Sequence, residues 1–216
     1  EDELTRIQEI AKALSKKASI SIRVNPDVNA NTHPYISTGL KENKFGVSEE
    51  SALNLYKKAK KMDSILIKGI DCHIGSQITD LKPFEDSVKK LIALIDKLEV
   101  EGIKIKHMDI GGGIGISYEG EKAIPFDDYA KAVTTLTKGR DFKILLEPGR
   151  VIMADAGAIL TKVEYVKKTQ DKNFAIIDAA MNDLMRPSLY GAFHKIFNTS
   201  VTTDKESIFD IVGPIC

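Results

Sequence analysis

The sequence predicts an α/β fold in which parallel strands alternate with helices, followed by a mostly β segment. Apolar strand-like runs alternate with amphipathic helical segments at a spacing of about 40 residues, which is typical of parallel strand–helix units. After residue 153 the connections become rich in glycine, asparagine and serine, and helical periodicity is weak. We therefore expect an α/β part at residues 1–153 and a mostly β part at residues 154–216.

The α/β part contains four expected strands. The chain opens on a helical pattern, because Leu4, Ile7 and Leu14 recur at helical spacing. Each strand that follows is a short apolar run, and the first is stopped by Asn25 and Pro26. The strands are expected at residues 20–24, 65–72, 103–110 and 142–146.

Three helices are expected between these strands. Ser48 suits the N-cap of the first, with Glu49 and Glu50 in its first turn. The second helix has a continuous apolar stripe that begins after Pro83. The helices are expected at residues 48–62, 83–98 and 126–137, and the strands of the mostly β part at 158–166, 174–178 and 208–212.

Composition excludes several classes of protein. The chain has 216 residues, of which 43% are hydrophobic, and its 31 basic and 31 acidic residues balance, which speaks against a nucleic-acid-binding surface. Cys72 and Cys216 are too few for a disulfide framework and favour a reducing compartment. No apolar run approaches the roughly 18 residues that a membrane span requires. We expect a soluble, cytoplasmic protein with no nucleic-acid or membrane partner.

The two ends of the sequence do not resemble natural termini. Glu1 already lies within a helical pattern, and Cys216 directly follows an apolar strand and Gly213-Pro214. We therefore expect the chain to be a fragment of a longer protein.

Polar residues gather where three of the expected strands end, at residues 71–77, 109–113 and 147–150. In parallel α/β folds the carboxyl ends of the strands carry the active site, in barrels and in open sheets alike. Three such strand ends in succession favour an enzyme.

The glycine run 111–113 lets backbone N–H groups approach a phosphate without obstruction by side chains. Ser76 can add a hydroxyl to the same anion site. A tight turn is the alternative interpretation. The run is not a dinucleotide fingerprint, because Ile116 stands where the last glycine belongs, and it is not a P-loop, because no Gly-Lys-Ser/Thr follows.

Other side chains at these strand ends have two interpretations each. His73 can be a hydrogen-bonded core histidine or can stack on an aromatic ligand. Glu147 can be solvated, can pair with Arg150, or can face a cationic ligand atom. The spacing of Asp71 from His73 and of His107 from Asp109 also permits a metal site, although no His-x-His or His-Glu-x-x-His pattern is present.

Taken together, these residues resemble one family, the pyridoxal-phosphate-dependent decarboxylases with the alanine-racemase fold, which act on diaminopimelate, ornithine or arginine. The later stretch 178–194 is similar to the diaminopimelate branch, whereas Asp71 and Ala180 depart from the usual pattern. The resemblance covers essentially the whole chain and rests on segments 23–26, 33–39, 44–46, 73–77, 109–113, 147–150 and 178–194.

The resemblance implies that residues 1–153 are the C-terminal half of a (β/α)8 barrel that binds pyridoxal 5'-phosphate, and that residues 154–216 begin a β domain. It implies a homodimer with shared active sites and an amino-acid substrate. The expected reaction is the decarboxylation of meso-diaminopimelate to lysine, as a step of lysine biosynthesis. The lysine that attaches the cofactor is expected upstream of Glu1, so the fragment alone is expected to be inactive.

The resemblance also implies roles for individual residues. His73 stacks on the pyridine ring, Glu147 pairs with the ring nitrogen, and Cys216 donates a proton. The phosphate is held by Ser76, Gly112, Gly113, and the backbone of Glu147, Pro148, Gly149 and Arg150. The substrate is contacted by Arg150, Arg186 and Tyr190.

Three alternative functions remain open at this stage. The first is a related decarboxylase of ornithine or arginine. The second is a metal-dependent barrel hydrolase. The third is a non-catalytic binding relative of the decarboxylases.

Overall fold

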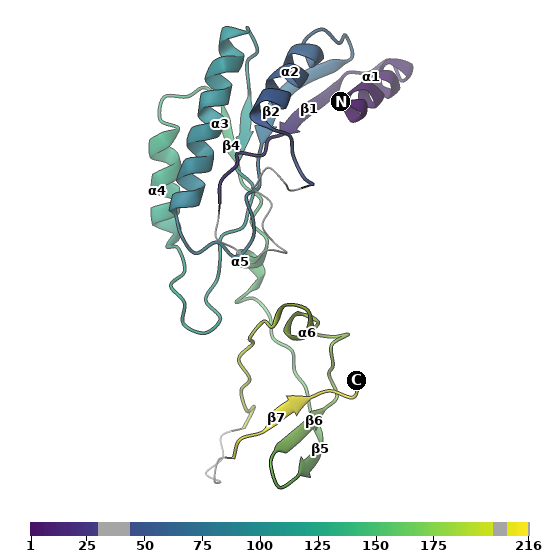
Figure 1. The fold of residues 1–216 in the computed structure, drawn as a ribbon, viewed down its shortest axis with the longest axis vertical. Coiled ribbons are helices and arrows are strands. Elements are labelled where there is room, and N and C mark those ends of the chain that lie inside the picture. The colour runs from purple at the N-terminus through teal and green to yellow at the C-terminus, as the bar shows by residue number, and fades with distance from the viewer. Residues whose placement is uncertain (30–43, 201–206, 216) are drawn as a thin grey trace. The chain divides into compact units, whose positions relative to one another are not determined.

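The computed structural model describes residues 1–29, 44–200 and 207–215 (Figure 1). Segment 33–39 and Cys216, which sequence analysis singled out, lie outside the described residues. The chain forms two compact units, which are described separately. The first comprises residues 1–117 and 121–155, and the second comprises residues 118–120 and 156–216.

The first unit is built on a four-stranded parallel sheet. Its strands follow chain order, each pairing in parallel with the next, so the prediction of a parallel α/β fold is confirmed. The strands are β1 (Ala18–Arg23), β2 (Ile65–Asp71), β3 (His107–Asp109) and β4 (Lys143–Leu145).

Four helices accompany these strands, and a one-turn helix follows the last of them. Ser48 is the N-cap of the second helix, as predicted, because its hydroxyl accepts a hydrogen bond from the N–H of Ser51 at 3.2 Å. None of the helices formed by the described residues is both long and apolar enough to cross a lipid bilayer. The helices are α1 (Asp2–Ala13), α2 (Glu49–Ala59), α3 (Lys82–Val100), α4 (Phe126–Leu136) and α5 (Arg150–Met153).

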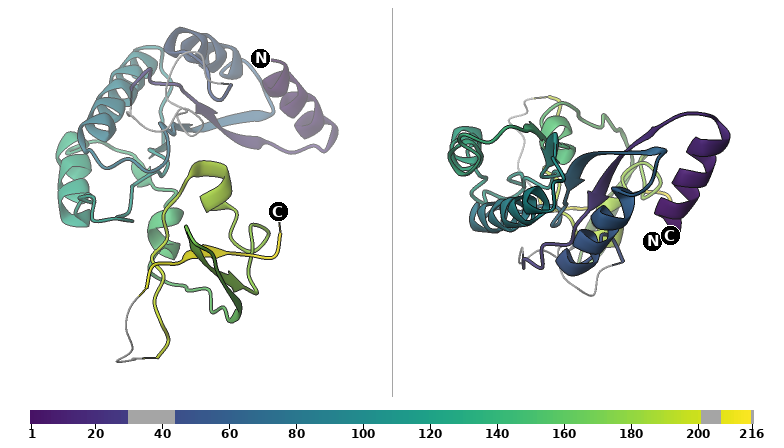
Figure 2. Two further views of the ribbon diagram at one scale, coloured as in Figure 1. Left: turned by 60° about the horizontal axis from the view of Figure 1, so that its bottom comes forward. Right: turned by 90° about the horizontal axis from the view of Figure 1, so that it is seen from above.

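One face of the sheet packs against the helices, as Figure 2 shows for α2, α3 and α4. Ile70 and Met108 on this face are fully buried. The Tyr56 ring on α2 is also buried, and its hydroxyl donates a hydrogen bond to the carbonyl of Gly69 at 2.7 Å. Alternate residues point to the opposite face, which carries the charged side chains of Asp71, Asp109 and Lys143.

Two of the predicted strands differ from the observed ones. β3 begins only at His107 rather than at residue 103, because Ile105 and Met108 are both buried and the alternation reverses between them. The pairing of β1 with β2 shifts register after Ile20, so Ser21 lies opposite Gly69. Both irregularities change which face a given side chain occupies.

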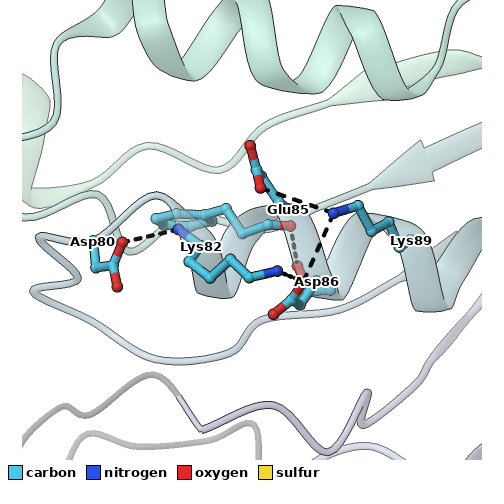
Figure 3. Close-up of polar contacts among 7 residues, drawn as sticks. Asp80, Lys82, Glu85, Asp86 and Lys89 are labelled. Atoms are coloured by element: carbon cyan, nitrogen blue, oxygen red, sulfur yellow. Dashed lines mark hydrogen bonds and ion pairs between the residues drawn. The ribbon is translucent and has the colours of Figure 1, made fainter.

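Charged side chains cluster at the start of α3 (Figure 3). The Asp80 carboxylate accepts a hydrogen bond from the N–H of Lys82 at 3.0 Å, and Lys82 pairs with Asp86 one turn later at 2.5 Å. Lys89 lies 3.8 Å from Glu85. These pairs are exposed, so each contributes little to stability. A surface cavity of about 450 Å³ next to them is lined by four of these residues, Asp80, Lys82, Asp86 and Lys89, and by five others.

The second unit contains a small sheet of three strands. β5 and β6 are antiparallel, and β7 pairs in parallel with β6. β5 starts at Val163 rather than at residue 158, because Thr161 and the N–H of Lys162 instead bond the carboxylate of Asp178. The elements are β5 (Val163–Lys168), β6 (Asn173–Ile177), α6 (Arg186–Tyr190) and β7 (Asp210–Val212).

The short helix α6 was not predicted. It has only 5 residues, too few for a visible periodicity, and Gly191 ends it in the left-handed conformation with φ 58°. In the described part of this unit, Ala175 is the one buried apolar residue.

Candidate functional site

The three polar strand ends are neighbours at the carboxyl edge of the parallel sheet. The N–H of Cys72 donates to the carbonyl of Asp109 at 3.0 Å, which joins the ends of β2 and β3. The N–H of Glu147 donates to the carbonyl of Gly111 at 2.9 Å, which joins the ends of β3 and β4. The expectation that these segments form one site on the sheet is therefore supported by direct contacts between them.

Each glycine of the run 111–113 is required by a neighbouring backbone. A Cβ on Gly111 would lie 2.5 Å from the carbonyl oxygen of Cys72, and one on Gly113 would lie 2.1 Å from that of Gly75. A Cβ on Gly112 would lie 2.1 Å from the carbonyl oxygen of Glu147. The glycines therefore allow the three loops to interlock, which neither of the two interpretations from sequence anticipated.

Backbone donors remain available in these loops. Throughout the described ranges, the N–H groups of Gly113 and Gly149 have no protein acceptor. Other donors of the glycine run are engaged, since the N–H of Gly111 bonds the Asp109 carboxylate at 2.9 Å. The loops that follow β2, β3 and β4 thus form a backbone cradle, in which fixed loops present unpaired N–H groups. Such an arrangement is suited to binding an anion.

His73 is half-buried beside the glycine run. The N–H of Gly112 donates to Nδ1 of His73 at 3.2 Å. Burial is the main cause of a lowered pKa for His73, and the positive charge of Arg23 acts in the same direction. The imidazole is therefore anchored by the Gly112 N–H, and its neutral form is favoured.

The face of the sheet opposite the helices carries a carboxylate pair. Asp71 and Asp109 are register partners on adjacent strands. The Ser21 hydroxyl donates to Asp71 at 2.6 Å, yet burial and the charge of Asp109 raise the pKa of Asp71. Over residues 1–29, 44–200 and 207–215, no three histidine, cysteine, aspartate or glutamate side chains are placed to hold a metal ion.

His107 occupies the same face and lies over Gly69, its register partner. A Cβ on Gly69 would lie 2.0 Å from Nε2 of His107, so glycine makes room for the ring. The buried Cys72 thiol points to the helix side, where burial raises its pKa to about 12. Neither residue has the geometry of a reactive group at the strand ends.

Arg150, at the start of α5, reaches the loop that follows β2. Its Nη2 donates to Oγ of Ser76, and its Nη1 donates to Oε1 of Gln77, both at 3.1 Å. Glu147, three residues earlier, is exposed. Within the described residues no ion pair joins Arg150 to Glu147 or to another carboxylate, so of the three interpretations of Glu147 the pairing with Arg150 is not the one observed.

Gln77 has contacts that the sequence did not reveal. Its side-chain amide bonds both backbone groups of Ile116, with its Nε2 donating to the carbonyl at 2.6 Å and its Oε1 accepting from the N–H at 3.2 Å. These partners are 39 residues away in the chain. In the sequence, a role for Gln77 was indicated only by its position within the motif at residues 73–77.

Two other predicted substrate residues lie together on α6 in the second unit. The guanidinium carbon of Arg186 is 5.1 Å from the centre of the Tyr190 ring. Nε of Arg186 is buried and has no hydrogen-bond partner within the described part of the chain. Cys216, the expected proton donor, lies outside the described residues.

Comparison with known proteins identifies the family of this chain. The family model described as "Pyridoxal-dependent decarboxylase, pyridoxal binding domain" matches residues 1–154. The chain belongs to this pyridoxal-dependent decarboxylase family.

Relatives within the pyridoxal-dependent decarboxylases agree on one name. Diaminopimelate decarboxylase of Vibrio cholerae is 50% identical over 217 residues, and that of Pseudomonas aeruginosa is 49% identical over 215 residues. Both alignments cover 100% of this chain and 52% of the relative, so the chain spans about half the length of the curated relatives that it matches.

A solved member of the pyridoxal-dependent decarboxylases has the same fold. The crystal structure of diaminopimelate decarboxylase from Helicobacter pylori complexed with L-lysine matches with a TM-score of 0.93 and 47% identity. The match covers 99% of this chain and 53% of that chain. The α/β fold with a parallel sheet is thus shared with a decarboxylase of known structure.

Family membership implies pyridoxal phosphate as the cofactor, and the residues at the strand ends fit such a group. A phosphate needs several donors and positive charge, and the site offers free backbone N–H groups and the guanidinium of Arg150. A pyridine ring needs a flat apolar surface, which the neutral imidazole of His73 provides.

Proposed function

We propose that the complete protein decarboxylates meso-diaminopimelate to lysine with pyridoxal phosphate. The observation that carries the proposal is the meeting of the glycine run, His73 and Arg150 at one edge of the sheet. The diaminopimelate decarboxylases that share about half the residues of this chain support the choice of substrate.

In this proposal, residues 1–153 are half of a (β/α)8 barrel and residues 154–216 begin a β domain. The sequential parallel order β1-β2-β3-β4, with helices on one face, is the arrangement that a barrel continues. The charged face that carries Asp71 and Asp109 would then line the barrel interior.

The residues of the first unit would bind and orient the cofactor. The N–H groups of Gly113 and Gly149 and the hydroxyl of Ser76 would hold its phosphate, Gly112 and segment 147–150 would shape the loops around it, and His73 would lie against its ring. When bound, pyridoxal phosphate supplies an acceptor for the electron pair released as carbon dioxide leaves. Glu147 would keep a proton on the ring nitrogen, because a carboxylate stabilises the positive charge there.

The residues of the second unit would act on the substrate. Arg186 would bind the distal carboxylate of diaminopimelate, since a guanidinium pairs with a carboxylate through two parallel hydrogen bonds. Tyr190 would support it through the ring contact described above. Cys216 would donate a proton to the α-carbon as a general acid.

We also propose a homodimer located in the cytoplasm. The family resemblance motivates the dimer, and the use of only two cysteines motivates the compartment. Light scattering of the purified full-length protein would measure its mass directly, and a monomeric mass at working concentration would contradict the dimer.

The test of the proposed function uses the full-length protein. Release of carbon dioxide is measured from meso-diaminopimelate, ornithine and arginine, each with and without added pyridoxal phosphate. We expect turnover of diaminopimelate that depends on the cofactor. Faster turnover of ornithine or arginine would contradict the substrate, and equal activity in fully cofactor-depleted protein would contradict the cofactor.

A further inference from the structure

Two carboxylates lie side by side on the face of the sheet opposite the helices. Asp71 and Asp109 are register partners on β2 and β3, so their side chains point to the same face. Neighbouring strands are about 4.8 Å apart, which brings the two carboxyl groups within reach of a hydrogen bond. Both residues are half-buried, and neither has a task in the proposed reaction.

Neither carboxylate is neutralised by a cation. Across the described parts of the chain, no lysine, arginine or histidine lies within ion-pair distance of Asp71 or Asp109. Arg23, the register partner of Asp71 on β1, instead lies over the ring of Phe45, 5.2 Å from its centre. Two adjacent negative charges without a counter-ion are unfavourable at a half-buried position, because burial and mutual repulsion both disfavour them.

The hydrogen bonds of the pair leave one oxygen of each carboxylate for the other. The Ser21 hydroxyl donates to Oδ1 of Asp71 at 2.6 Å, and the N–H of Gly111 donates to Oδ1 of Asp109 at 2.9 Å. No donor among the described residues reaches either Oδ2 atom. A single proton between these two oxygens converts a repulsive contact into a hydrogen bond, as in other close carboxylate pairs.

The charges around the pair favour a proton on it. Burial is the largest cause of a raised pKa for Asp71, and the negative charge of Asp109 acts in the same direction. The Ser21 hydrogen bond and the charges of Arg23 and His107 oppose these effects without outweighing them. The titratable groups that share this face with Asp71 are Arg23 on β1, His73 after β2, His107 and Asp109 on β3, and Lys143 on β4.

From this arrangement we infer that Asp71 and Asp109 share one proton between β2 and β3, which makes the carboxyl edge of the sheet sensitive to pH. With the proton present, the pair is a hydrogen bond across two strands. Its loss leaves two negative charges facing each other, two residues before His73 on one strand and before Gly111 on the other. The inference goes beyond the proposed function and does not depend on it, because the pair is assigned neither to the cofactor nor to the substrate.

Two substitutions imitate the protonated pair. In Asp71→Asn and in Asp109→Asn, the amide oxygen can keep the existing hydrogen bond, from Ser21 or from Gly111, while the amide N–H donates to the remaining carboxylate. Asp80→Asn is the matched control. The Asp80 carboxylate also accepts a hydrogen bond from the N–H two residues later, that of Lys82, but at an exposed position.

The first measurement is the thermal unfolding of full-length protein between about pH 5 and pH 8. The folded chain holds the shared proton at a pH where the unfolded chain, with the ordinary value of 3.8, has lost it. The stabilising effect of the proton is therefore complete below 3.8 and is lost as pH rises through the folded pKa. At about pH 8 we expect each asparagine variant of the pair to unfold on the order of 2–4 °C above wild type, with a difference that shrinks as pH falls. Asp80→Asn should show no such growth with pH.

The second measurement is infrared spectroscopy, which distinguishes a protonated carboxyl group from a carboxylate. We expect wild type to keep a protonated carboxyl band above the pH at which an ordinary aspartate has lost it, and both asparagine variants of the pair to lack this band. If one variant fails to fold, the other variant and the wild-type band still decide.

Two results would overturn the inference. One is a difference in unfolding temperature that does not grow with pH for either variant, and the other is a band that both substitutions leave unchanged. Neither result bears on the proposed function, because that function is tested by turnover of diaminopimelate.

Discussion

Nδ1 of His73 accepts a hydrogen bond from the backbone N–H of Gly112 at 3.2 Å. A ring nitrogen that accepts a hydrogen bond carries no proton, so His73 is held in the tautomer protonated at Nε2. The glycine run therefore fixes the orientation of the imidazole as well as shaping the cradle.

The first prediction concerns the charge of His73. Burial and Arg23 lower its pKa, while Asp109 opposes them. We expect the neutral Nε2–H form at neutral pH and a midpoint below the ordinary value of 6.5. Nuclear magnetic resonance of histidine-labelled full-length protein measures it, with the signal assigned by its loss in His73→Gln. A midpoint above the ordinary value would contradict the prediction.

The lowered pKa of His73 also predicts a dependence of stability on pH. The unfolded chain binds a proton near pH 6.5, whereas the folded protein binds it only at lower pH. The contribution of His73 to stability is therefore complete above the unfolded value and is lost as pH falls through the folded one. Between about pH 7.5 and pH 5.5, wild type should lose more unfolding free energy than His73→Gln. If the unfolding free energies of the two proteins changed in parallel with pH, the prediction would be contradicted.

A further prediction compares two glycines of the site. Gly112→Ala places a Cβ 2.1 Å from the carbonyl oxygen of Glu147, whereas a Cβ at Gly149 meets nothing within 4 Å. We expect Gly112→Ala to lower the free energy of unfolding by at least about 2 kcal/mol, because a rigid backbone must move. Gly149→Ala is the control and should change it by less than about 0.5 kcal/mol. Chemical denaturation of the full-length variants decides the comparison, and equal stabilities would refute it.

Glu147 provides a test of the cofactor-facing carboxylate. Glu147→Gln should leave pyridoxal phosphate bound but lower kcat on the order of 100-fold, about 2.7 kcal/mol of barrier, because an amide does not stabilise a protonated ring nitrogen. Absorbance of the bound cofactor and steady-state kinetics measure the two effects. Glu50→Gln, on the exposed first turn of α2, serves as control. A kcat within about threefold of wild type would rule out this role.

Arg186 provides a test of substrate choice. Arg186→Ala should reduce kcat/KM for diaminopimelate by about 2–5 kcal/mol of transition-state stabilisation, as for truncation of one partner of a buried charge pair. Turnover of ornithine or lysine, which lack the distal carboxylate, should barely change. Glu50→Gln, on the exposed first turn of α2, is the control and should remain close to wild type with every substrate. A loss of the same size for every substrate would contradict the assignment.

The sequence predicted the parallel sheet and the gathering of polar residues at three strand ends, which the structure brings into contact. Apolar runs such as 65–72 alternate with helices, and parallel strands must place their polar ends at one edge. Residues near in sequence to those ends, such as His73 and Glu147, were found for this reason. The local sequence pattern was sufficient to predict these strand ends, because each polar motif directly follows its own strand.

Features that depend on distant contacts escaped prediction. The register shift beside Gly69 arises from pairing between β1 and β2, and it is invisible in either strand alone. The role of Gln77 depends on Ile116 and Arg150, which are remote in the chain. Helix α6 was missed because a five-residue helix has no measurable period.

Because the loops interlock at residues 111–113, the presence of this glycine run in a related protein does not by itself indicate that the protein binds a phosphate. A larger side chain at any of these positions would collide with Cys72, Gly75 or Glu147, whether or not a ligand is present. A descendant that had lost all catalysis would still need these glycines to close its strand ends.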